Sequence, residues 1–362
     1  MKNSYGKALT VTLFGESHGE AIGAVIDGIA PGIKIDDEYI NKKLTLRRPS
    51  GLISTKRVEA DEYSIISGVF NGYTTGSPLT VIIKNSDTRS KDYSKISALP
   101  RPSHADYAAE CKYHGFQDYR GGGHFSGRIT AALVLVGAII GSALERKGIK
   151  IASHISELHG IKDRSFSDFD SDFKALSDMT FPILSKDAGL KMEEEIKKAA
   201  SEGDSVGGIL ESMIVGIPAG VGEPWFDSVE SEIAHILFSI GGIKGVEFGA
   251  GFDFANMLGS EANDPFIIKE GEIITETNNN GGINGGITNG MPIIVRSAVK
   301  PTPSIRKEQK TVNMKDMTEE NLVIEGRHDP AIIHRVRAVV DAALAIAVAD
   351  MLTVRYGTDY LA

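Results

Sequence analysis

The chain has 362 residues, of which 41% are hydrophobic, and a formal net charge of -9 at pH 7. This length and composition support a large core and exclude a disordered chain. The acidic balance excludes a general nucleic-acid-binding surface, and the single cysteine, Cys111, excludes an intrachain disulfide. The longest uncharged run, residues 129–144, is shorter than a membrane span of ~20 residues. A cytoplasmic protein without a signal peptide, a nucleic-acid partner or a membrane partner is therefore expected.

Apolar periodicity predicts strands and helices along the whole chain, without repeats or linkers. The predicted strands, several of them in adjacent pairs, are residues 8–14, 21–29, 63–70, 79–84, 149–159, 206–217, 246–249 and 291–299. The predicted helices are residues 36–46, 129–144, 186–200, 228–238 and 338–352, the first of them beginning at residue 36 or 37. Residues 160–203 are charged and less patterned, and they are expected at the periphery.

Residues 119–130 read Tyr-Arg-Gly-Gly-Gly-His-Phe-Ser-Gly-Arg-Ile-Thr. The glycines allow a ligand to approach the backbone closely. The start of the following helix offers an anion unpaired N–H groups and the positive end of the dipole. Arg128 adds a permanent positive charge. A tight turn before a core helix is the plain alternative. A dinucleotide-binding fingerprint is rejected, because Ser126 stands where the third glycine belongs and no buried strand precedes the turn.

Three earlier stretches are candidates for anion binding or proton transfer. His18 lies between glycines at the end of a predicted strand. Arg47 and Arg48 begin a basic stretch without an acid, which suits phosphate or carboxylate groups. His104 follows Ser103 in a sequence that resembles a helix capping box. The plain alternatives are surface histidines, a capped helix and arginines that favour the end of a helix.

Three later stretches also admit two interpretations. Residues 300–304, Lys-Pro-Thr-Pro-Ser, combine a charge and two hydroxyls on a segment stiffened by proline. The polar, glycine-rich residues 278–290 form either a flexible loop or a loop that wraps a ligand. Asp329 lies between arginines and before a proline, as a structural ion pair or as a proton relay. The sequence contains no P-loop and no zinc motif, so no metal is expected.

Six stretches occur in the order seen in one family: residues 15–19, 47–49, 101–106, 119–128, 300–304 and 326–330. On these motifs the chain resembles the chorismate synthase family, from about residue 5 to residue 355. The resemblance implies a single α+β domain over residues 1–362, a sandwich of central helices between two antiparallel β-sheets, assembled as a homotetramer. It implies a 1,4-elimination of phosphate from 5-enolpyruvylshikimate 3-phosphate that gives chorismate. It further implies a requirement for reduced FMN without net redox change, in which the flavin lends electron density and recovers it.

The resemblance also implies roles for individual residues. The catalytic residues are His18 near the leaving phosphate, His104 at the reduced flavin and Asp329 in a proton relay. The residues implied to bind substrate are Ser17, Arg47, Arg48, Arg128 and Arg337. The residues implied to contact FMN are His124, Phe125, Ser126, Gly241, Gly242, Gly285, Lys300, Pro301, Thr302, Pro303, Ser304 and Arg327. The chain departs from some relatives, which have Arg at position 124 and Asn-Ala at positions 241–242.

Two other functions compete with this interpretation. An FMN-dependent oxidoreductase acting on a phosphorylated carboxylate metabolite would share the flavin contacts but would consume a reductant in each turnover. A non-catalytic protein that binds phosphorylated metabolites would use the same basic stretches. Because no nucleotide fingerprint is present, NADPH is expected only as an indirect reductant, with an external flavin reductase as a partner.

Overall fold

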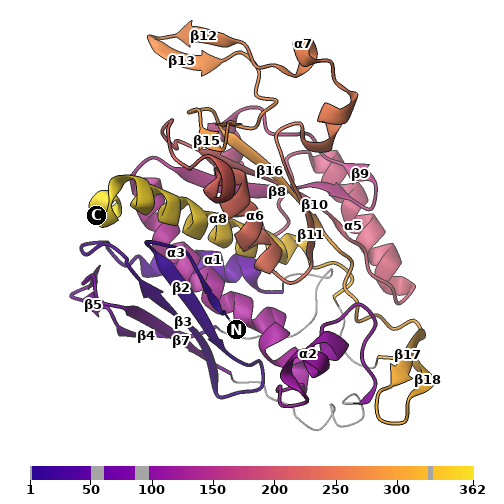
Figure 1. The fold of residues 1–362 in the computed structure, drawn as a ribbon. Coiled ribbons are helices and arrows are strands. Elements are labelled where there is room, and N and C mark those ends of the chain that lie inside the picture. The colour runs from indigo at the N-terminus through magenta and orange to yellow at the C-terminus, as the bar shows by residue number, and fades with distance from the viewer. Residues whose placement is uncertain (1, 50–60, 86–97, 325–328) are drawn as a thin grey trace.

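The structure is a computed structural model that describes residues 2–49, 61–85, 98–324 and 329–362. Two five-stranded antiparallel sheets enclose a layer of helices (Figure 1). In sheet order, the first sheet consists of β1 (Ser4–Tyr5), β2 (Thr10–Gly15), β3 (Ala21–Asp27), β7 (Leu79–Lys84) and β4 (Tyr63–Ser67). The second sheet consists of β11 (Ile243–Phe248), β16 (Ile293–Val299), β10 (Gly208–Val215), β8 (Lys150–Leu158) and β9 (Ile161–Lys162). Each predicted strand corresponds to strands of these sheets.

The helices divide into a central layer and an outer set. The central layer consists of α1 (Asp37–Arg47), α3 (Thr130–Arg146), α6 (Val229–Ser239) and α8 (Ile333–Tyr356). The outer helices are α2 (Asp106–Tyr113), α4 (Phe169–Leu176), α5 (Lys186–Ser201) and α7 (Gly259–Ala262). The small strand pairs are β5 (Val69–Phe70) with β6 (Tyr73–Thr74), β12 (Phe266–Lys269) with β13 (Glu272–Thr275), β14 (Ile283–Asn284) with β15 (Ile287–Thr288), and β17 (Gln309–Asn313) with β18 (Thr318–Leu322). This arrangement confirms the expected sandwich of central helices between two antiparallel sheets.

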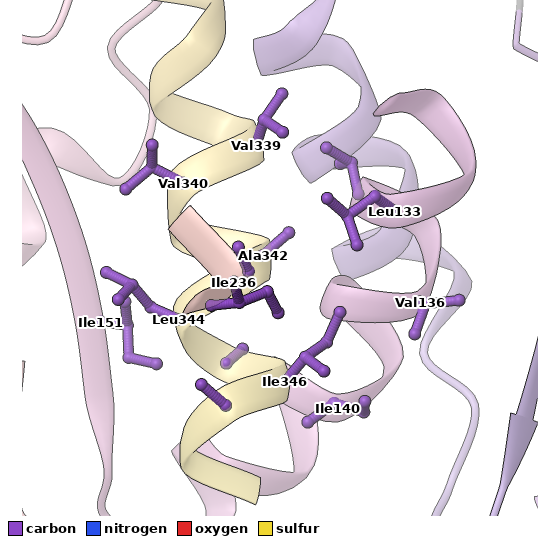
Figure 2. Close-up of a cluster of buried hydrophobic side chains, with 14 of the residues drawn as sticks. Leu133, Val136, Ile140, Ile151, Ile236, Val339, Val340, Ala342, Leu344 and Ile346 are labelled. Atoms are coloured by element: carbon purple, nitrogen blue, oxygen red, sulfur yellow. The ribbon is translucent and has the colours of Figure 1, made fainter. Parts of the chain in front are cut away.

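Helices α3 and α8 form the centre of the core. An ideal Cβ atom at Gly137 of α3 would lie 2.3 Å from the Cβ of Ala342 of α8, so the two backbones approach closely only because position 137 is glycine. Figure 2 shows Ile140 of α3 beside Ile346 of α8, with Ile151 of β8 on the other side of α8. All three isoleucine side chains are buried. Burying each one contributes about 1.5–3 kcal/mol to the stability of the fold.

The helix around α3 is also long and apolar enough to cross a membrane, over Gly127–Arg146. It is the only such helix in the described part of the chain, and 83% of its apolar window is buried inside the protein. Because it is covered by α8 and by both sheets, it has the burial of a core helix.

Some elements differ from the expectation. Helix α8 begins at Ile333, five residues before the predicted start, and α4 and the β12–β13 and β17–β18 pairs were not predicted. The β12–β13 hairpin stands apart from the sandwich (Figure 1). Its apolar side chains are exposed, with 69% exposure for Phe266 and 79% for Ile268. The apolar side chains of β12 and β13 do not pack against the core. For that reason, apolar periodicity did not predict this strand pair.

Candidate active site

The loop between β2 and β3 lies against the glycine turn that precedes α3. The main-chain N–H of Ser17 donates to the oxygen of Gly123 at 3.1 Å, and the Ser17 hydroxyl donates to the oxygen of Arg120 at 3.1 Å. His124 Nδ1 lies 2.7 Å from the oxygen of Gly15. A carbonyl oxygen only accepts, so this nitrogen carries the proton. Three hydrogen bonds therefore join two stretches that are about 100 residues apart.

His18 is almost completely buried in this contact. Its Nδ1 lies 3.0 Å from the hydroxyl oxygen of Ser17. An ideal Cβ atom at Gly121 would lie 2.2 Å from His18 Cε1 and 2.8 Å from Ser17 Oγ. Gly121 also has a φ of +58°, a conformation that favours glycine. As expected, the glycines form a turn ahead of a buried helix. This turn, Arg120–Phe125, is an irregular 3-10 turn that makes room for the histidine.

His104 lies beside Gly122 of the same turn. It forms a cluster with the side chains of Arg101 and Asp106. Its Nδ1 is 2.6 Å from Asp106 Oδ1, and Arg101 donates from Nε and Nη2 to the two oxygens of Asp106, each at 2.7 Å. Burial acts to raise the pKa of Asp106, but the hydrogen bonds from Arg101 and then from His104 outweigh it and hold that pKa well below its ordinary value. The expected cap at Ser103 is wrong, because Ala105 occupies the N-cap position and Arg101 takes the carboxylate of Asp106.

A pocket opens beside this cluster, between α2 and the glycine turn. His104, Gly122 and Phe125 line it together with Tyr119 and Met314. An ideal Cβ atom at Gly122 would lie 3.4 Å from His104 Cε1, so the turn borders both histidines. Tyr119 and Phe125 remain about half exposed. Aromatic side chains at the edge of a concave site suit a flat ring.

Residues 300–304 reach the same place from the end of β16. Lys300 donates from Nζ to the oxygen of Ser103 at 2.5 Å, and its main-chain N–H donates to the oxygen of Gly242 at 2.9 Å. Burial, followed by the charge of Lys244, lowers the pKa of Lys300. The hydroxyl of Thr302 is buried and has no hydrogen-bond partner among the described residues. The side chain of Lys300 thus reaches the residue next to His104, while its main chain is held by Gly242.

Three arginines surround the buried carboxylate of Asp61. Arg47 Nη2 donates to Asp61 Oδ2 at 2.9 Å, Arg128 donates to Oδ1, and Arg48 Nε lies 3.5 Å from Oδ2. Burial acts to raise the pKa of Asp61, but Arg47 and then Arg128 outweigh it and lower that pKa. Three positive charges on one carboxylate favour a further anion. Sequence reasoning missed Asp61, because Arg47 and Arg128 are 14 and 67 residues away along the chain.

Asp329 connects to this cluster through Arg335. Arg335 donates from Nη1 to Asp329 at 2.6 Å and from Nε to the main-chain oxygen of Arg47 at 3.0 Å. The end of α1 and the start of α8 are therefore held together by one guanidinium group. Sequence reasoning noticed an acid among arginines, but it did not assign Arg335 this bridging position.

Two expected site residues lie apart from the others, and one cannot be placed. The Arg337 side chain of α8 is buried between β8 and α4, where it donates to the main-chain oxygens of Ser153 and Leu176, and it lies 3.7 Å from Asp341. Gly285 lies in the β14–β15 turn at the start of α6, and Gly241 and Gly242 follow its end. The 11 residues of α6, about 16 Å long, therefore separate Gly285 from Gly241 and Gly242. Arg327 lies outside the described residues.

The fold, a helical layer between antiparallel sheets, carries two histidines and an arginine cluster near one glycine turn, which fits an enzyme that acts on a multiply anionic small molecule. The family model described as chorismate synthase matches residues 9–353. The chain belongs to the chorismate synthase family.

Individual relatives agree over nearly the whole chain. A chorismate synthase from Thermococcus gammatolerans is 47% identical over 347 residues, which cover 96% of each protein. One from Pyrococcus abyssi is 45% identical over 351 residues, which cover 97% of each. A crystal structure of chorismate synthase has a TM-score of 0.77 and 30% identity, and the match covers 98% of this chain and 94% of that chain. The protein is accordingly a carbon–oxygen lyase of the shikimate pathway that eliminates phosphate from 5-enolpyruvylshikimate 3-phosphate to form chorismate.

Proposed function

We propose that the elimination takes place at the glycine turn, with His18 and His104 as its acid–base groups and reduced FMN in the pocket beside His104. One observation carries this proposal: the neighbouring glycines 121 and 122 border the two histidines. An ideal Cβ atom would lie 2.2 Å from His18 at Gly121 and 3.4 Å from His104 at Gly122. Both imidazoles are therefore within reach of a ligand that lies on one short piece of backbone.

Residues of the pocket and of the nearby segment 300–304 fit a flavin. The buried Thr302 hydroxyl, without a partner in the described part of the chain, is a hydrogen-bonding group that a ligand would satisfy. Lys300 supplies a positive charge for a phosphate, and Phe125 supplies an apolar face. The residues that would hold FMN are His124, Phe125, Ser126, Gly241, Gly242, Lys300, Pro301, Thr302, Pro303 and Ser304. When bound, the reduced flavin supplies electron density to the substrate as phosphate leaves and recovers it afterwards.

The protein supplies the charges and protons for the substrate. Arg47, Arg48 and Arg128 would hold its anionic groups, and the buried Nε of Arg47, which has no hydrogen-bond partner among the described residues, is a donor for one of them. His18, with Ser17 beside it, would neutralise the leaving phosphate. Asp329, held in place by Arg335, would serve in the relay of the proton removed from the ring. The site proposed here within one chain does not include Arg337 or Gly285.

We further infer a homotetramer of one-domain chains over residues 1–362 in the cytoplasm, supplied with reduced flavin by an external reductase. The continuous core between the two sheets supports one domain. Sedimentation analysis tests the assembly, with a mass other than four chains as the contrary result. An anaerobic assay with NADPH as the only reductant tests whether an external reductase must supply the reduced flavin. Turnover without added reductase would show that NADPH acts directly.

An anaerobic assay with catalytic amounts of reduced FMN tests the function. Chorismate and phosphate should form in equal amounts without stoichiometric consumption of a reductant; if each turnover consumed one, the oxidoreductase alternative would hold. The double variant His18→Ala/His104→Ala should bind flavin and substrate but lose most of the rate, because acid–base groups contribute about 10²–10⁴-fold each. If both binding and phosphate release were unchanged, neither histidine would be catalytic.

A further inference from the structure

We propose that Asp106 is a positioning residue for His104, whose carboxylate keeps the imidazole proton on Nδ1 and leaves the Nε2 edge to face the pocket. The inference rests on the proposed role of His104 as an acid–base group. It adds the residue that decides which nitrogen of the ring exchanges the proton.

The hydrogen bonds around Nδ1 define its protonation. Asp106 Oδ1 lies 2.6 Å from His104 Nδ1, and Arg101 Nη2 lies 3.0 Å from the same nitrogen. If Nδ1 accepted from Arg101, its lone pair would face a carboxylate oxygen at 2.6 Å, and two acceptors would repel each other. Asp106 is ionised, because Arg101 lowers its pKa. The Nδ1–H group therefore donates to Asp106 in a charge-assisted hydrogen bond.

Arg101 holds the carboxylate in that position. Besides the two side-chain hydrogen bonds at 2.7 Å, the main-chain N–H of Arg101 donates to Asp106 Oδ2 at 2.9 Å. Both side chains are largely buried, with exposures of 13% for Arg101 and 21% for Asp106. Three bonds to one short side chain leave Asp106 little freedom, so the orientation of His104 is set before any ligand binds.

The opposite edge of the ring faces the glycine turn. An ideal Cβ atom at Gly122 would lie 3.4 Å from His104 Cε1 and 3.6 Å from Nε2. With the proton on Nδ1, the neutral ring presents a lone pair at Nε2, and the imidazolium presents an N–H there. Nε2 is thus the atom through which His104 takes up or releases a proton in the pocket.

Nitrogen NMR of ¹⁵N-histidine-labelled protein, without cofactor or substrate, tests the inference, with His104→Ala used to assign the signals. The neutral His104 ring of the unsubstituted protein should carry its proton on Nδ1. In Asp106→Asn, the side-chain amide can turn its NH₂ group to Nδ1, so the proton should move to Nε2. Under assay conditions, kcat should fall about 10²-fold or more, as expected for a histidine in the wrong tautomer, with KM for the substrate little changed.

Glu195→Gln is the matched control. Glu195 accepts from His159 Nδ1 at 2.8 Å on the surface, so this variant should change only the signals of His159 and leave kcat intact. The double variant Asp106→Asn/His104→Ala should be no slower than His104→Ala, because Asp106 acts through His104. If Asp106→Asn does not fold, Asp106→Glu retains the carboxylate and should retain the Nδ1–H tautomer.

The contrary outcomes are separate for the two claims. A proton on Nε2 in the unsubstituted protein or in Asp106→Glu would overturn the inference, as would an unchanged tautomer and kcat in Asp106→Asn. A full rate in His104→Ala would instead overturn the proposed acid–base role of His104. The NMR result would still report whether Asp106 orients the ring.

Discussion

The carboxylate of Asp61 accepts a hydrogen bond from Arg47 at 2.9 Å, and both side chains are almost completely buried. Arg48 and Arg128 share the same carboxylate. Removing one partner of a buried ion pair costs about 3–5 kcal/mol. Asp61→Asn should therefore lose stability of that order, and added phosphate should restore part of it by supplying a negative charge. Urea unfolding with and without phosphate measures both effects, and a variant as stable as the unsubstituted protein would contradict the prediction.

Gly121→Ala should displace His18. The added Cβ atom would lie 2.2 Å from His18 Cε1, and neither the buried ring nor the hydrogen-bonded turn has room to give way. We expect a loss of about 10²-fold or more in kcat. Gly72→Ala is the control, because Gly72 also has a positive φ, +80°, but its Cβ atom would meet nothing within 4 Å. The positive φ should cost each variant about 1–2 kcal/mol of stability, and the overlap with His18 should add to that loss only in Gly121→Ala. Equal kcat values for the two variants would contradict the steric argument.

Thr302→Val should weaken flavin binding without destabilising the protein. The Thr302 hydroxyl has no partner in the described structure, so removing it loses no internal hydrogen bond. Losing its bond to FMN should raise the Kd about 10-fold, equivalent to about 1.4 kcal/mol. Thr275→Val is the comparison, because the buried Thr275 hydroxyl donates to the oxygen of Thr277 at 2.6 Å. That variant should lose stability and keep its Kd in a fluorescence titration with FMN. The reverse pattern would contradict the assignment of Thr302.

Arg337→Met should affect folding and not substrate affinity. Its guanidinium group lies 3.7 Å from the buried carboxylate of Asp341 and donates hydrogen bonds to the main-chain oxygens of Ser153 and Leu176. The variant removes this cation from Asp341, which keeps its hydrogen bond from the Ser153 hydroxyl at 2.5 Å. Removing one partner of a buried ion pair should cost about 3–5 kcal/mol. Arg47→Met should also destabilise the protein, but it should raise KM as well. A KM for Arg337→Met that rises as much as that of Arg47→Met would place Arg337 in the substrate site.

His154 should make stability depend on pH. It lies between Glu211 at 3.0 Å and Asp163 at 3.4 Å, without exposure to solvent. Burial acts to lower the pKa of His154, but the neighbouring carboxylates of Asp163 and Glu211 outweigh it and raise that pKa above 6.5. The native state then holds the proton more tightly than the unfolded chain. The stabilisation is therefore complete below about pH 6.5 and is lost as the pH rises through the native pKa.

Within that window, the unfolding free energy should fall by up to about 1.4 kcal/mol per pH unit. His154→Gln should lack this part of the slope, because a glutamine binds no proton. Urea unfolding over a pH series above 6.5 compares the two proteins. Parallel curves would show that His154 does not titrate in this range.

Local patterns could predict much of the fold. Residue alternation defined the β2–β3 pair, and an uncharged run defined α3, because short-range periodicity alone decides such elements. The early start of α8 could not be predicted in this way. Two arginines, Arg335 and Arg337, are typical of an exposed loop. In the folded protein, Arg335 donates to Asp329, and Arg337 lies near Asp341 and donates to a main-chain oxygen. Partners that come from other elements are invisible to a local pattern.

The site shows the same division. Family motifs located His18 and His104, but no motif indicated that one glycine turn separates them. Asp61 could not be predicted, because the arginines that explain it come from distant parts of the chain. Asp106 did leave a local signal, two residues after His104. The same spacing also predicts a capping box with Ser103, because a carboxylate near a helix start serves either purpose.

The hydrogen bond between Lys300 Nζ and the oxygen of Ser103 joins residues 197 positions apart. The contact between Ser17 and Arg120 spans 103 positions. Closing such long loops is slow compared with forming hairpins and helices. Regained secondary structure should therefore precede regained activity when the unfolded chain is returned to native conditions. Folding intermediates would contain the β2–β3 hairpin and the α3 helix before they could bind any ligand.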